Sequence, residues 1–331
     1  MSDRPHEGLE EEFTPWPGSG PKPPWLKKPL PRAAALRSME GLLRGLHLHT
    51  VCESALCPNL GECFERGTAT FLILGDVCTR DCGFCGVKGG TPLPPDPAEP
   101  DRVAQAVARL GLDHVVLTSV TRDDLPDGGA AHYVRVMQAL RQQAPQAKIE
   151  VLVPDFKGLR ENVDRVLEQS PAVFNHNLET VPRLYPTVRP QADYERSLRV
   201  LAWAATRGGA MVKTGLMVGL GEAPEEVFAV LEDAVRAGVS VVTIGQYLRP
   251  SAHHLPVVEY ISPRVFADYA RYGRLLGLAV YAAPFVRSSY RAGETFAELG
   301  AEQSGLQYER EQTHDEQGRE VLPGPGPGGI Q

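Results

Sequence analysis

The sequence predicts an α/β protein, a partial (β/α)6 barrel of the TIM type with an extension at each end of the chain. Through the middle of the 331 residues, short apolar runs rich in β-branched residues alternate with longer helical patterns. This alternation is typical of a parallel sheet covered by helices. Six such units are too few to close the eight-unit barrel, so we expect an open one.

The N-terminal extension is the first element in order. Residues 1–32 are acidic and then proline-rich, with seven prolines between Pro15 and Pro31. Proline removes a backbone donor and fixes φ, so this segment is predicted to be a tail or an extended arm rather than a helix or a central strand. Ala33–Leu46 follows with the spacing of an amphipathic helix.

The barrel units come next, and each pairs one strand with one helix. The strands are predicted at Thr70–Val77, His114–Val120, Lys148–Val153, Ala172–Asn177, Ala210–Val218 and Val239–Tyr247. The helices are predicted near residues 101–110, 131–143, 158–169, 193–207, 225–237 and 263–276.

The C-terminal part begins with an apolar run, Leu278–Ala283, that is expected to flank the sheet edge. From about Glu309 the chain is polar and ends in glycine and proline, which predicts a disordered tail. The chain therefore divides into an arm (1–50), a central domain (51–290) and a C-terminal extension (291–331).

Composition excludes several classes of function. The hydrophobic content of 42% is ordinary for a globular enzyme, and the net charge of -7 lacks the basic signature of nucleic-acid binding. No apolar run is long enough to cross a bilayer, and the acidic N-terminus does not resemble a signal peptide. We expect a cytoplasmic protein without membrane or nucleic-acid partners, whose thiols stay reduced.

All six cysteines fall between Cys52 and Cys85, in two triplets. Their spacings are C-x4-C-x5-C for Cys52, Cys57 and Cys63, and C-x3-C-x2-C for Cys78, Cys82 and Cys85. A disulfide framework would spread cysteines along the chain, so the clustering favours a metal cofactor. Thiolates anchor iron–sulfur clusters. A zinc site on the first triplet with His47 or His49 is the alternative.

Polar residues follow the predicted strands at their carboxyl ends, where parallel-sheet enzymes carry their chemistry. We expect them to line one mouth together with the second cysteine triplet. They are Thr121 to Asp124, Glu150 within its strand, Asn175 to Asn177, Gly219 to Glu222, and Gln246.

The second triplet, on the loop after the first strand and with Phe84 between its last two cysteines, resembles the radical S-adenosylmethionine (SAM) superfamily. The resemblance implies that Cys78, Cys82 and Cys85 hold three irons of a [4Fe–4S] cluster. The fourth iron binds SAM, and an electron from the cluster cleaves SAM to give methionine and a 5′-deoxyadenosyl radical. The protein positions and shields this chemistry.

The first triplet narrows the resemblance to the lipoyl synthase family. Matching stretches cover most of residues 22–300. They are GTATFLILGDVCTR, TSVTRDDLPDGGA, HNLETVPRLYPTVRP, KTGLMVGLGE, TIGQYLRPS and VRSSY. Thr121, Gly83, Gly86 and Arg291 depart from the family pattern, but none of them is an expected ligand. The resemblance implies insertion of two sulfur atoms at C6 and C8 of a protein-bound octanoyl-lysine.

The resemblance also implies a second, auxiliary [4Fe–4S] cluster that is consumed as the sulfur source. Its expected ligands are Cys52, Cys57, Cys63 and Ser289 of the Arg-Ser-Ser-Tyr stretch, with Ser288 as the fallback. A serine oxygen holds iron less tightly than a thiolate and could release it when sulfur leaves. Arg287 is expected beside Ser289, where it would offset the cluster's negative charge.

The remaining expected site residues contact SAM or the substrate. Glu150 stands in an apolar run, where an unpaired carboxylate would be costly, so a ribose hydroxyl is its suggested partner. Arg189 and Lys213 either balance the SAM carboxylate or form structural ion pairs. The full set of expected SAM contacts is Phe84, Thr118, Ser119, Arg122, Asp123, Gly128, Gly129, Glu150, Asn175, Asn177, Gly215, Gly219 and Glu222.

The expected partners also follow from the family. They are octanoylated lipoyl carrier domains (the E2 component of 2-oxoacid dehydrogenases and the glycine cleavage H protein), an electron donor such as flavodoxin or ferredoxin, and an iron–sulfur carrier that rebuilds the auxiliary cluster. The basic segment Lys22–Lys28 is either a solvated arm or a docking strip for an acidic carrier. Two other functions stay open: a different sulfur-inserting radical enzyme, and a non-catalytic metal carrier.

Overall fold

The computed structural model describes residues 16–28, 33–66, 68–294 and 296–298. The chain divides into two compact units, Met1–Tyr290 and Arg291–Gln331. All elements below belong to the first unit. The disordered tail expected from about Glu309 lies outside the described residues. The three-part division of the chain stays a prediction.

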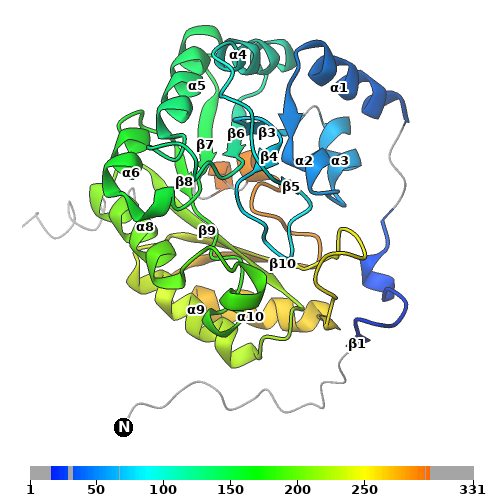
Figure 1. Cartoon of the computed structure of the whole chain (residues 1–331). Helices are drawn as coiled ribbons and strands as arrows, with labels where there is room; N and C mark the ends of the chain where they lie inside the picture. Colours follow the sequence, from blue (N-terminus) through cyan, green and yellow to red (C-terminus); the bar gives the residue numbers. More distant parts are fainter. Residues whose placement is uncertain (1–15, 29–32, 67, 295, 299–331) are drawn as a thin grey trace, which may run out of the picture. The chain divides into compact units, whose positions relative to one another are not determined.

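An open, eight-stranded sheet forms the centre of the first unit (Figure 1), in the order β12-β10-β9-β8-β7-β6-β3-β2. All neighbours are parallel except the edge strand β2, which pairs antiparallel with β3. The strands are β2 (His49–Thr50), β3 (Thr70–Ile73), β6 (His114–Ser119), β7 (Lys148–Leu152), β8 (Val173–Asn175), β9 (Met211–Val218), β10 (Val241–Gln246) and β12 (Ala279–Ala282). The six expected barrel strands are thus confirmed as consecutive neighbours, and the expected edge run is β12.

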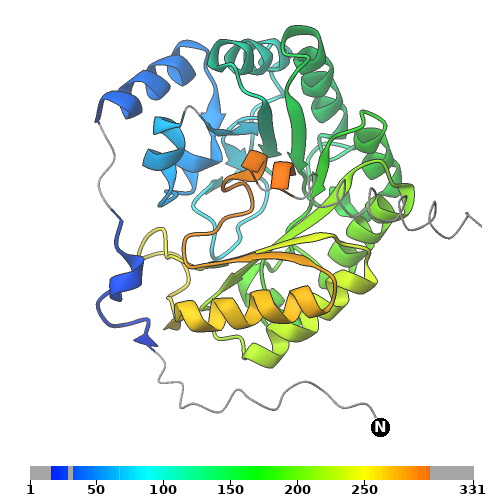
Figure 2. The same cartoon turned by 180° about the vertical axis from the view of Figure 1, so that it is seen from behind.

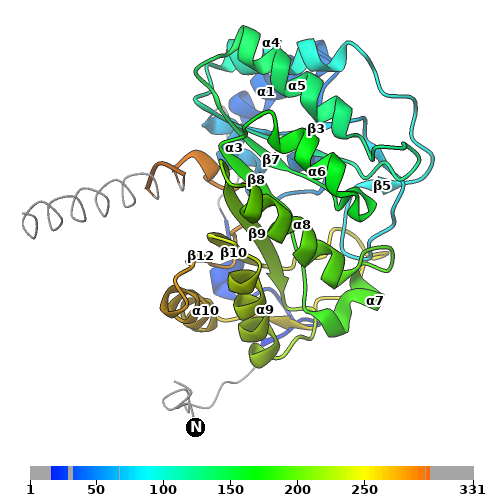
Figure 3. The same ribbon diagram turned by 90° about the vertical axis from the view of Figure 1, so that its left-hand side faces the viewer.

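Six helices follow the strands and lie side by side along the sheet (Figure 3). They are α4 (Glu99–Leu110), α5 (Ala130–Gln143), α6 (Arg160–Leu167), α8 (Tyr194–Arg207), α9 (Pro224–Arg236) and α10 (Pro263–Leu275). The helix expected before the cysteines is α1 (Ala33–Gly45). Each helix turns an apolar stripe inward, as Val103, Ala104 and Val107 of α4 do, because a one-sided helix must bury that stripe.

Short elements decorate this framework. The N-terminal arm, expected as tail or extended chain, contributes a strand and one turn of 3-10 helix: β1 (Trp16–Pro17), which pairs with β11 (Glu259–Tyr260), and η1 (Pro24–Leu26). The first cysteine triplet lies on and between α2 (Val51–Ser54) and α3 (Leu60–Glu65). The others are β4 (Val77–Cys78), β5 (Lys88–Gly89), η2 (Phe156–Gly158), η3 (Pro182–Leu184) and α7 (Tyr185–Val188).

The first barrel strand is shorter than expected. The sequence predicted Thr70–Val77, but β3 ends at Ile73 because Leu74 and Gly75 take left-handed φ values of 69° and 91°. Glu99 accepts the Leu74 N–H at 2.8 Å, and the Arg122 guanidinium donates to the Leu74 carbonyl at 3.4 Å. Both polar groups of the kinked residue are therefore satisfied, and the chain leaves the sheet early to form the loop with the second cysteine triplet.

None of the helices in the part of the chain that the structure describes is both long and apolar enough to span a membrane.

Candidate active site

A cavity of about 320 Å³ contains most of the chemistry expected from the sequence. Residues from the loops after the sheet strands line it, together with α2 and the segment after β12. In Figure 2 that segment (orange) runs inside the barrel beside the loop after β3 (cyan). Five of the six cysteines line this cavity: Cys52, Cys57, Cys78, Cys82 and Cys85.

The radical-SAM-type loop places Cys78 on β4, with two backbone N–H groups directed at its sulfur. The N–H of Arg80 lies 3.4 Å from Cys78 Sγ, and that of Thr121 lies 3.3 Å away. Both donors come from the backbone, so they hold the sulfur in place without another side chain. At Gly86 a Cβ would meet the Ser54 carbonyl oxygen at 2.9 Å, so glycine lets this loop pack against the segment of the first triplet. The two triplets are neighbours for this reason.

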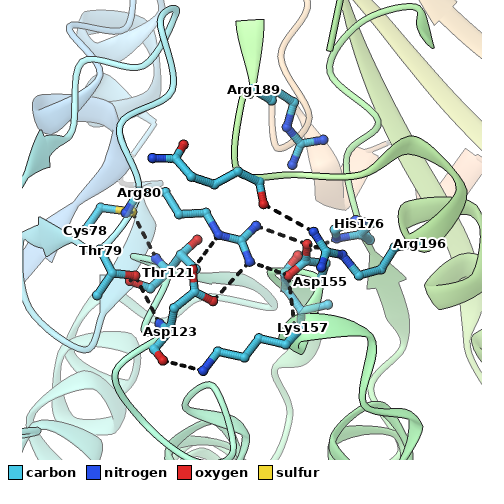
Figure 4. Close-up of polar contacts among 12 residues, drawn as sticks. Cys78, Thr79, Arg80, Thr121, Asp123, Asp155, Lys157, His176, Arg189 and Arg196 are labelled. Atoms are coloured by element: carbon cyan, nitrogen blue, oxygen red, sulfur yellow. Dashed lines mark hydrogen bonds and ion pairs between the residues drawn. The ribbon is translucent and has the colours of Figure 1, made fainter. Parts of the chain in front are cut away.

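Arg80, inside the cysteine loop, ties that loop to the ends of two strands (Figure 4). Its guanidinium makes bidentate ion pairs with Asp123 after β6 (2.7 and 3.0 Å) and with Asp155 after β7 (2.7 and 3.0 Å). Arg196 of α8 also pairs with Asp155, at 2.9 Å. Burial would raise the pKa of Asp155, but Arg80 overrides it and holds that pKa at about 2. The loop is therefore anchored to the ends of β6 and β7, and its partner Asp155 is ionised at neutral pH.

The first triplet is held by a different contact. Thr50 caps α2 through its side chain, which places Cys52 in the first turn of the helix. Thr70 of β3 hydrogen-bonds Cys52 and also donates to Ser289 Oγ at 2.8 Å. Thr70, on the first barrel strand, thus links Cys52 to Ser289, which lies 219 positions after Thr70 in the sequence.

The thiols suit a soft metal cluster. All six cysteines are free. Burial raises the pKa of Cys52 to about 12, that of Cys63 to about 11 and that of Cys85 to about 12. Metal binding would release these protons, and it supplies the partner that a buried thiolate lacks. Among the described residues no three His, Cys, Asp or Glu side chains are placed to hold one metal ion.

In an extended chain, the side chains of the Arg-Ser-Ser-Tyr stretch would alternate between two faces. The stretch is instead a turn, in which the Tyr290 N–H bonds the Arg287 carbonyl at 3.0 Å. A turn forms because the chain reverses direction after β12, where Val286 N–H already bonds the Ala283 carbonyl. The two serines still diverge: Ser289 faces Thr70, and Ser288 donates to Asn177 Oδ1 at 2.9 Å.

Two glycines let this turn lie against the ends of the strands. A Cβ on Gly245 would meet the Val286 carbonyl oxygen at 2.0 Å, and one on Gly215 would meet Ser288 Oγ at 2.5 Å. Arg287 follows on the cavity wall, where burial lowers the pKa of its guanidinium while Cys57 and Glu179 oppose that shift. Arg287 is therefore a cation of the cavity wall near Cys57.

The opposite wall is polar. The Nδ1 atom of His176 donates a hydrogen bond to the Val153 carbonyl at 2.8 Å. Its other ring nitrogen, Nε2, is buried, and no hydrogen bond from the described residues reaches it. Burial and then Arg189 lower the pKa of His176 to about 4, so this ring is neutral and offers an acceptor to the cavity. Beside it, Asn177 donates to Glu179 at 3.0 Å. Glu179 holds a strained φ of 67°.

The expected SAM contacts separate into two groups. Those that line the cavity, with the cysteines, Arg287 and Ser289, are Phe84, Thr118, Ser119 and Asn177. Those outside the lining are Arg122, Asp123, Gly128, Gly129, Glu150, Asn175, Gly215, Gly219 and Glu222. Cys63 also stands outside the lining, on α3.

Most residues of the second group have partners inside the protein. Glu150 lies between Lys213 (3.0 Å) and His114 (3.3 Å), which resolves the cost of its burial without a ligand. Arg122 pairs with Asp124. Gly129 begins α5 with a positive φ.

The expected SAM contacts Gly215, Gly219 and Glu222 form one motif at and after the end of β9, and this motif closes a turn. The Glu222 carboxylate accepts the backbone N–H groups of Gly219 and Leu220. A Cβ on Gly219 would meet Gln246 Nε2 at 2.2 Å. The roles of this motif toward SAM stay predictions.

Sequence reasoning missed three charged groups: Arg80, Asp155 and Glu179. Arg80 could have been found, because an arginine inside a cysteine loop needs an anion partner. Asp155 and Glu179 carried no such signal, since their roles depend on contacts across strands and on an unusual backbone angle.

Comparison with known proteins is consistent with this site. The family model described as the radical SAM superfamily matches residues 72–245. A protein of Chlorobium chlorochromatii named lipoyl synthase is 53% identical over 279 residues, which are 84% of this chain and 95% of that protein. One of Rubrobacter xylanophilus with the same name is 50% identical and covers 88% of this chain and 92% of its own length. Among solved structures, HydG, a maturase of the [FeFe]-hydrogenase, aligns with a TM-score of 0.51 at 17% identity, over 73% of this chain and 61% of that one.

Proposed function

The chain belongs to the lipoyl synthase family within the radical SAM superfamily, and from this premise we propose which residues carry each half of its reaction. The enzyme is a radical SAM sulfurtransferase. It inserts two sulfur atoms into an octanoyl chain held on a protein lysine, giving a lipoyl group. The observation that carries the assignment of roles is the cavity lined by cysteines of both triplets.

The radical half is assigned to Cys78, Cys82 and Cys85, which would hold a [4Fe–4S] cluster with one iron open to SAM. When both are bound, the cluster and SAM would supply a carbon radical able to remove hydrogen from unactivated C–H bonds. Arg80 fixes the cysteine loop through Asp123 and Asp155. The neutral His176 and the Asn177–Glu179 pair offer polar contacts for the hydroxyl and amino groups of SAM.

The sulfur half is assigned to Cys52, Cys57, Cys63 and Ser289, which would hold the auxiliary cluster as a substrate. The bridge from Cys52 through Thr70 to Ser289 supports serine rather than a solvent ligand in the fourth position. Arg287 lies on the same wall and would offset negative charge as sulfide leaves. A serine oxygen can release iron where a thiolate would retain it.

The proposed macromolecular substrate is an octanoylated lipoyl domain, of the E2 component of 2-oxoacid dehydrogenases or of the glycine cleavage H protein. A flavodoxin or ferredoxin would supply electrons, and an iron–sulfur carrier would rebuild the auxiliary cluster. The free cysteines support a reducing, cytoplasmic setting. In the basic segment Lys22–Lys28, Lys28 pairs with Glu62, whereas Lys22 and Lys27 are exposed, so the docking strip for an acidic carrier stays a proposal that rests on those two lysines.

Mass spectrometry of an octanoyl-lysyl peptide tests this function. After anaerobic reconstitution, incubation with reductant and SAM should convert the peptide to its lipoyl form, and the protein should carry about eight irons. A protein that carries zinc, or one that cleaves SAM but never adds sulfur to the peptide, would contradict the proposal.

A further inference from the structure

The Lys28 side chain of the N-terminal arm lies where three distant segments of the chain meet. Its Nζ is 2.5 Å from Asn59 Oδ1 and 3.0 Å from Glu62 Oε2. Asn59 immediately precedes α3, and Glu62 is the residue before Cys63 on that helix. Lys28 therefore binds to α3, the helix that carries Cys63.

The same ammonium group also contacts the turn that follows β12. It lies 4.9 Å from the centre of the Phe285 ring and 5.5 Å from that of Tyr290, within the range of cation–π attraction. Tyr290 is the residue after Ser289. Lys28 thus touches the neighbours in sequence of two expected cluster ligands, Cys63 and Ser289.

Direct hydrogen bonds between helix and turn complete the arrangement. Asn59 Nδ2 donates to the Phe285 carbonyl at 2.7 Å, and the Tyr290 hydroxyl donates to Glu62 Oε1 at 2.8 Å. These bonds join residues 226 and 228 positions apart. We call the five residues Lys28, Asn59, Glu62, Phe285 and Tyr290 the lysine clasp.

Burial makes the clasp more than a surface ion pair. The side chain of Lys28 is 24% exposed and that of Glu62 is 32% exposed, while Asn59 is buried. Partly desolvated, charge-assisted bonds are stronger than exposed ones. Removing Lys28 would take the ammonium group away from the buried Asn59 side chain and from the partly buried Glu62 carboxylate.

We propose that Lys28 is a positioning residue for the auxiliary site: it ties the helix of Cys63 to the turn of Ser289, so that the serine oxygen is presented to the three cysteines. This inference rests on the proposed function of those ligands. A serine is a weak iron ligand, so its binding depends on being held in place before the cluster arrives. Lys28 also adds a positive charge beside thiolates and sulfides.

Two readouts test the clasp with Lys28→Met, which keeps the apolar stem and removes the charge. The matched control is Lys27→Met, because Lys27 is exposed and adjacent. The first readout is amide hydrogen exchange of residues 284–290 in the cluster-free protein. We expect faster exchange of this segment in Lys28→Met, on the order of tenfold, and no change in Lys27→Met.

The second readout is chelator-induced iron loss, in a background where Cys78, Cys82 and Cys85 are alanine and only the auxiliary cluster can bind. Lys28→Met should lose iron about tenfold faster than the background, and Lys28→Arg should restore most of the retention because it keeps the charge and stacks on aromatic rings. In the otherwise unmutated enzyme, 5′-deoxyadenosine formation by Lys28→Met should stay normal while lipoyl product falls.

The outcomes separate the possibilities. Equal exchange and equal iron loss in Lys28→Met and Lys27→Met would overturn the clasp alone. If the variant with alanine at Cys78, Cys82 and Cys85 binds no iron, the assignment of Cys52, Cys57, Cys63 and Ser289 as ligands is wrong. The proposal for the lysine clasp then fails with it. If Lys28→Met folds poorly, Tyr290→Phe, which removes one hydroxyl, decides the matter: unchanged iron loss in that variant would also overturn the proposal.

Discussion

The two adjacent serines of the turn after β12 face different halves of the cavity. Ser289 reaches Cys52 through Thr70, whereas Ser288 reaches Asn177 on the polar wall that also contains His176. Because the turn is tight, the hydroxyl oxygens of these consecutive residues point in different directions, that of Ser288 toward Asn177 and that of Ser289 toward Thr70. This divergence supports the proposal that Ser289, rather than Ser288, is the fourth ligand of the auxiliary cluster.

Ser289→Ala should therefore keep SAM cleavage and lose sulfur insertion by tenfold or more, in the range seen when residues around a metal are removed. Ser289→Cys should bind the cluster well but release sulfur poorly, because thiolate holds iron more tightly. Ser288→Ala is the control, and it should retain most product. The measurement is the ratio of lipoyl product to 5′-deoxyadenosine. Normal product from both alanine variants would remove serine ligation from the account.

Asp155 gives a prediction about pH. Its folded-state pKa of about 2 lies below the ordinary 3.8, so its stabilisation is complete above pH 3.8 and is lost as the pH falls toward 2. Asp155→Asn should lower the free energy of unfolding by about 3 kcal/mol at pH 7, because Arg80 and Arg196 lose a buried anion. Urea titrations at several pH values check this.

The difference between wild type and Asp155→Asn should shrink by about 2 kcal/mol as the pH drops through that window. The exposed Asp101→Asn serves as control and should show little effect at any pH. A difference that stays constant from pH 7 to pH 3 would mean that the charge of Asp155 contributes nothing.

At the scale of elements, the turn of residues 287–290 depends on glycines in β9 and β10. Gly245→Ala places a Cβ 2.0 Å from the Val286 carbonyl oxygen, and backbone cannot yield as a side chain can. We expect a loss of about 2 kcal/mol in the free energy of unfolding and a displaced turn. Gly41→Ala, in the exposed interior of α1 with nothing within 4 Å of its Cβ, should instead be neutral or slightly stabilising. Thermal and urea unfolding of both variants compare the two. Equal stability would contradict the close packing of the turn.

The two cysteine elements should be separable by iron content. Replacing Cys78, Cys82 and Cys85 by alanine should abolish 5′-deoxyadenosine formation and leave about four irons on the chain. Replacing Cys52, Cys57 and Cys63 should leave SAM cleavage intact, also with about four irons, and yield no lipoyl product. Iron analysis with product chromatography checks both variants. SAM cleavage at the wild-type rate in the first variant would exclude the radical assignment.

Over the whole molecule, the fold was largely predictable and the site only in part. Apolar periodicity located the barrel strands and helices, since burial on the sheet imposes it locally. It could not show that β3 stops at Ile73, because the kink is fixed by Glu99 of α4 and by Arg122 after β6. The cysteine spacing predicted a metal cofactor, and the expectation of one cluster on each triplet came from the family resemblance and stays a prediction. The lysine clasp and the ion pairs of Arg80 with Asp123 and Asp155 could not be predicted from the sequence, because each joins segments far apart in the chain.

We propose that one cavity brings a radical source and a sulfur source to the same octanoyl chain. A single turnover with heavy-isotope sulfide tests it most directly. The enzyme is reconstituted with labelled sulfide, freed of excess, and given an octanoyl-lysyl peptide, SAM and reductant in unlabelled buffer. Mass spectrometry should find both inserted sulfur atoms labelled, with at most one product per chain. The Cys52, Cys57, Cys63 alanine variant should give none. Lipoyl product with unlabelled sulfur, or labelled product from that variant, would contradict the account.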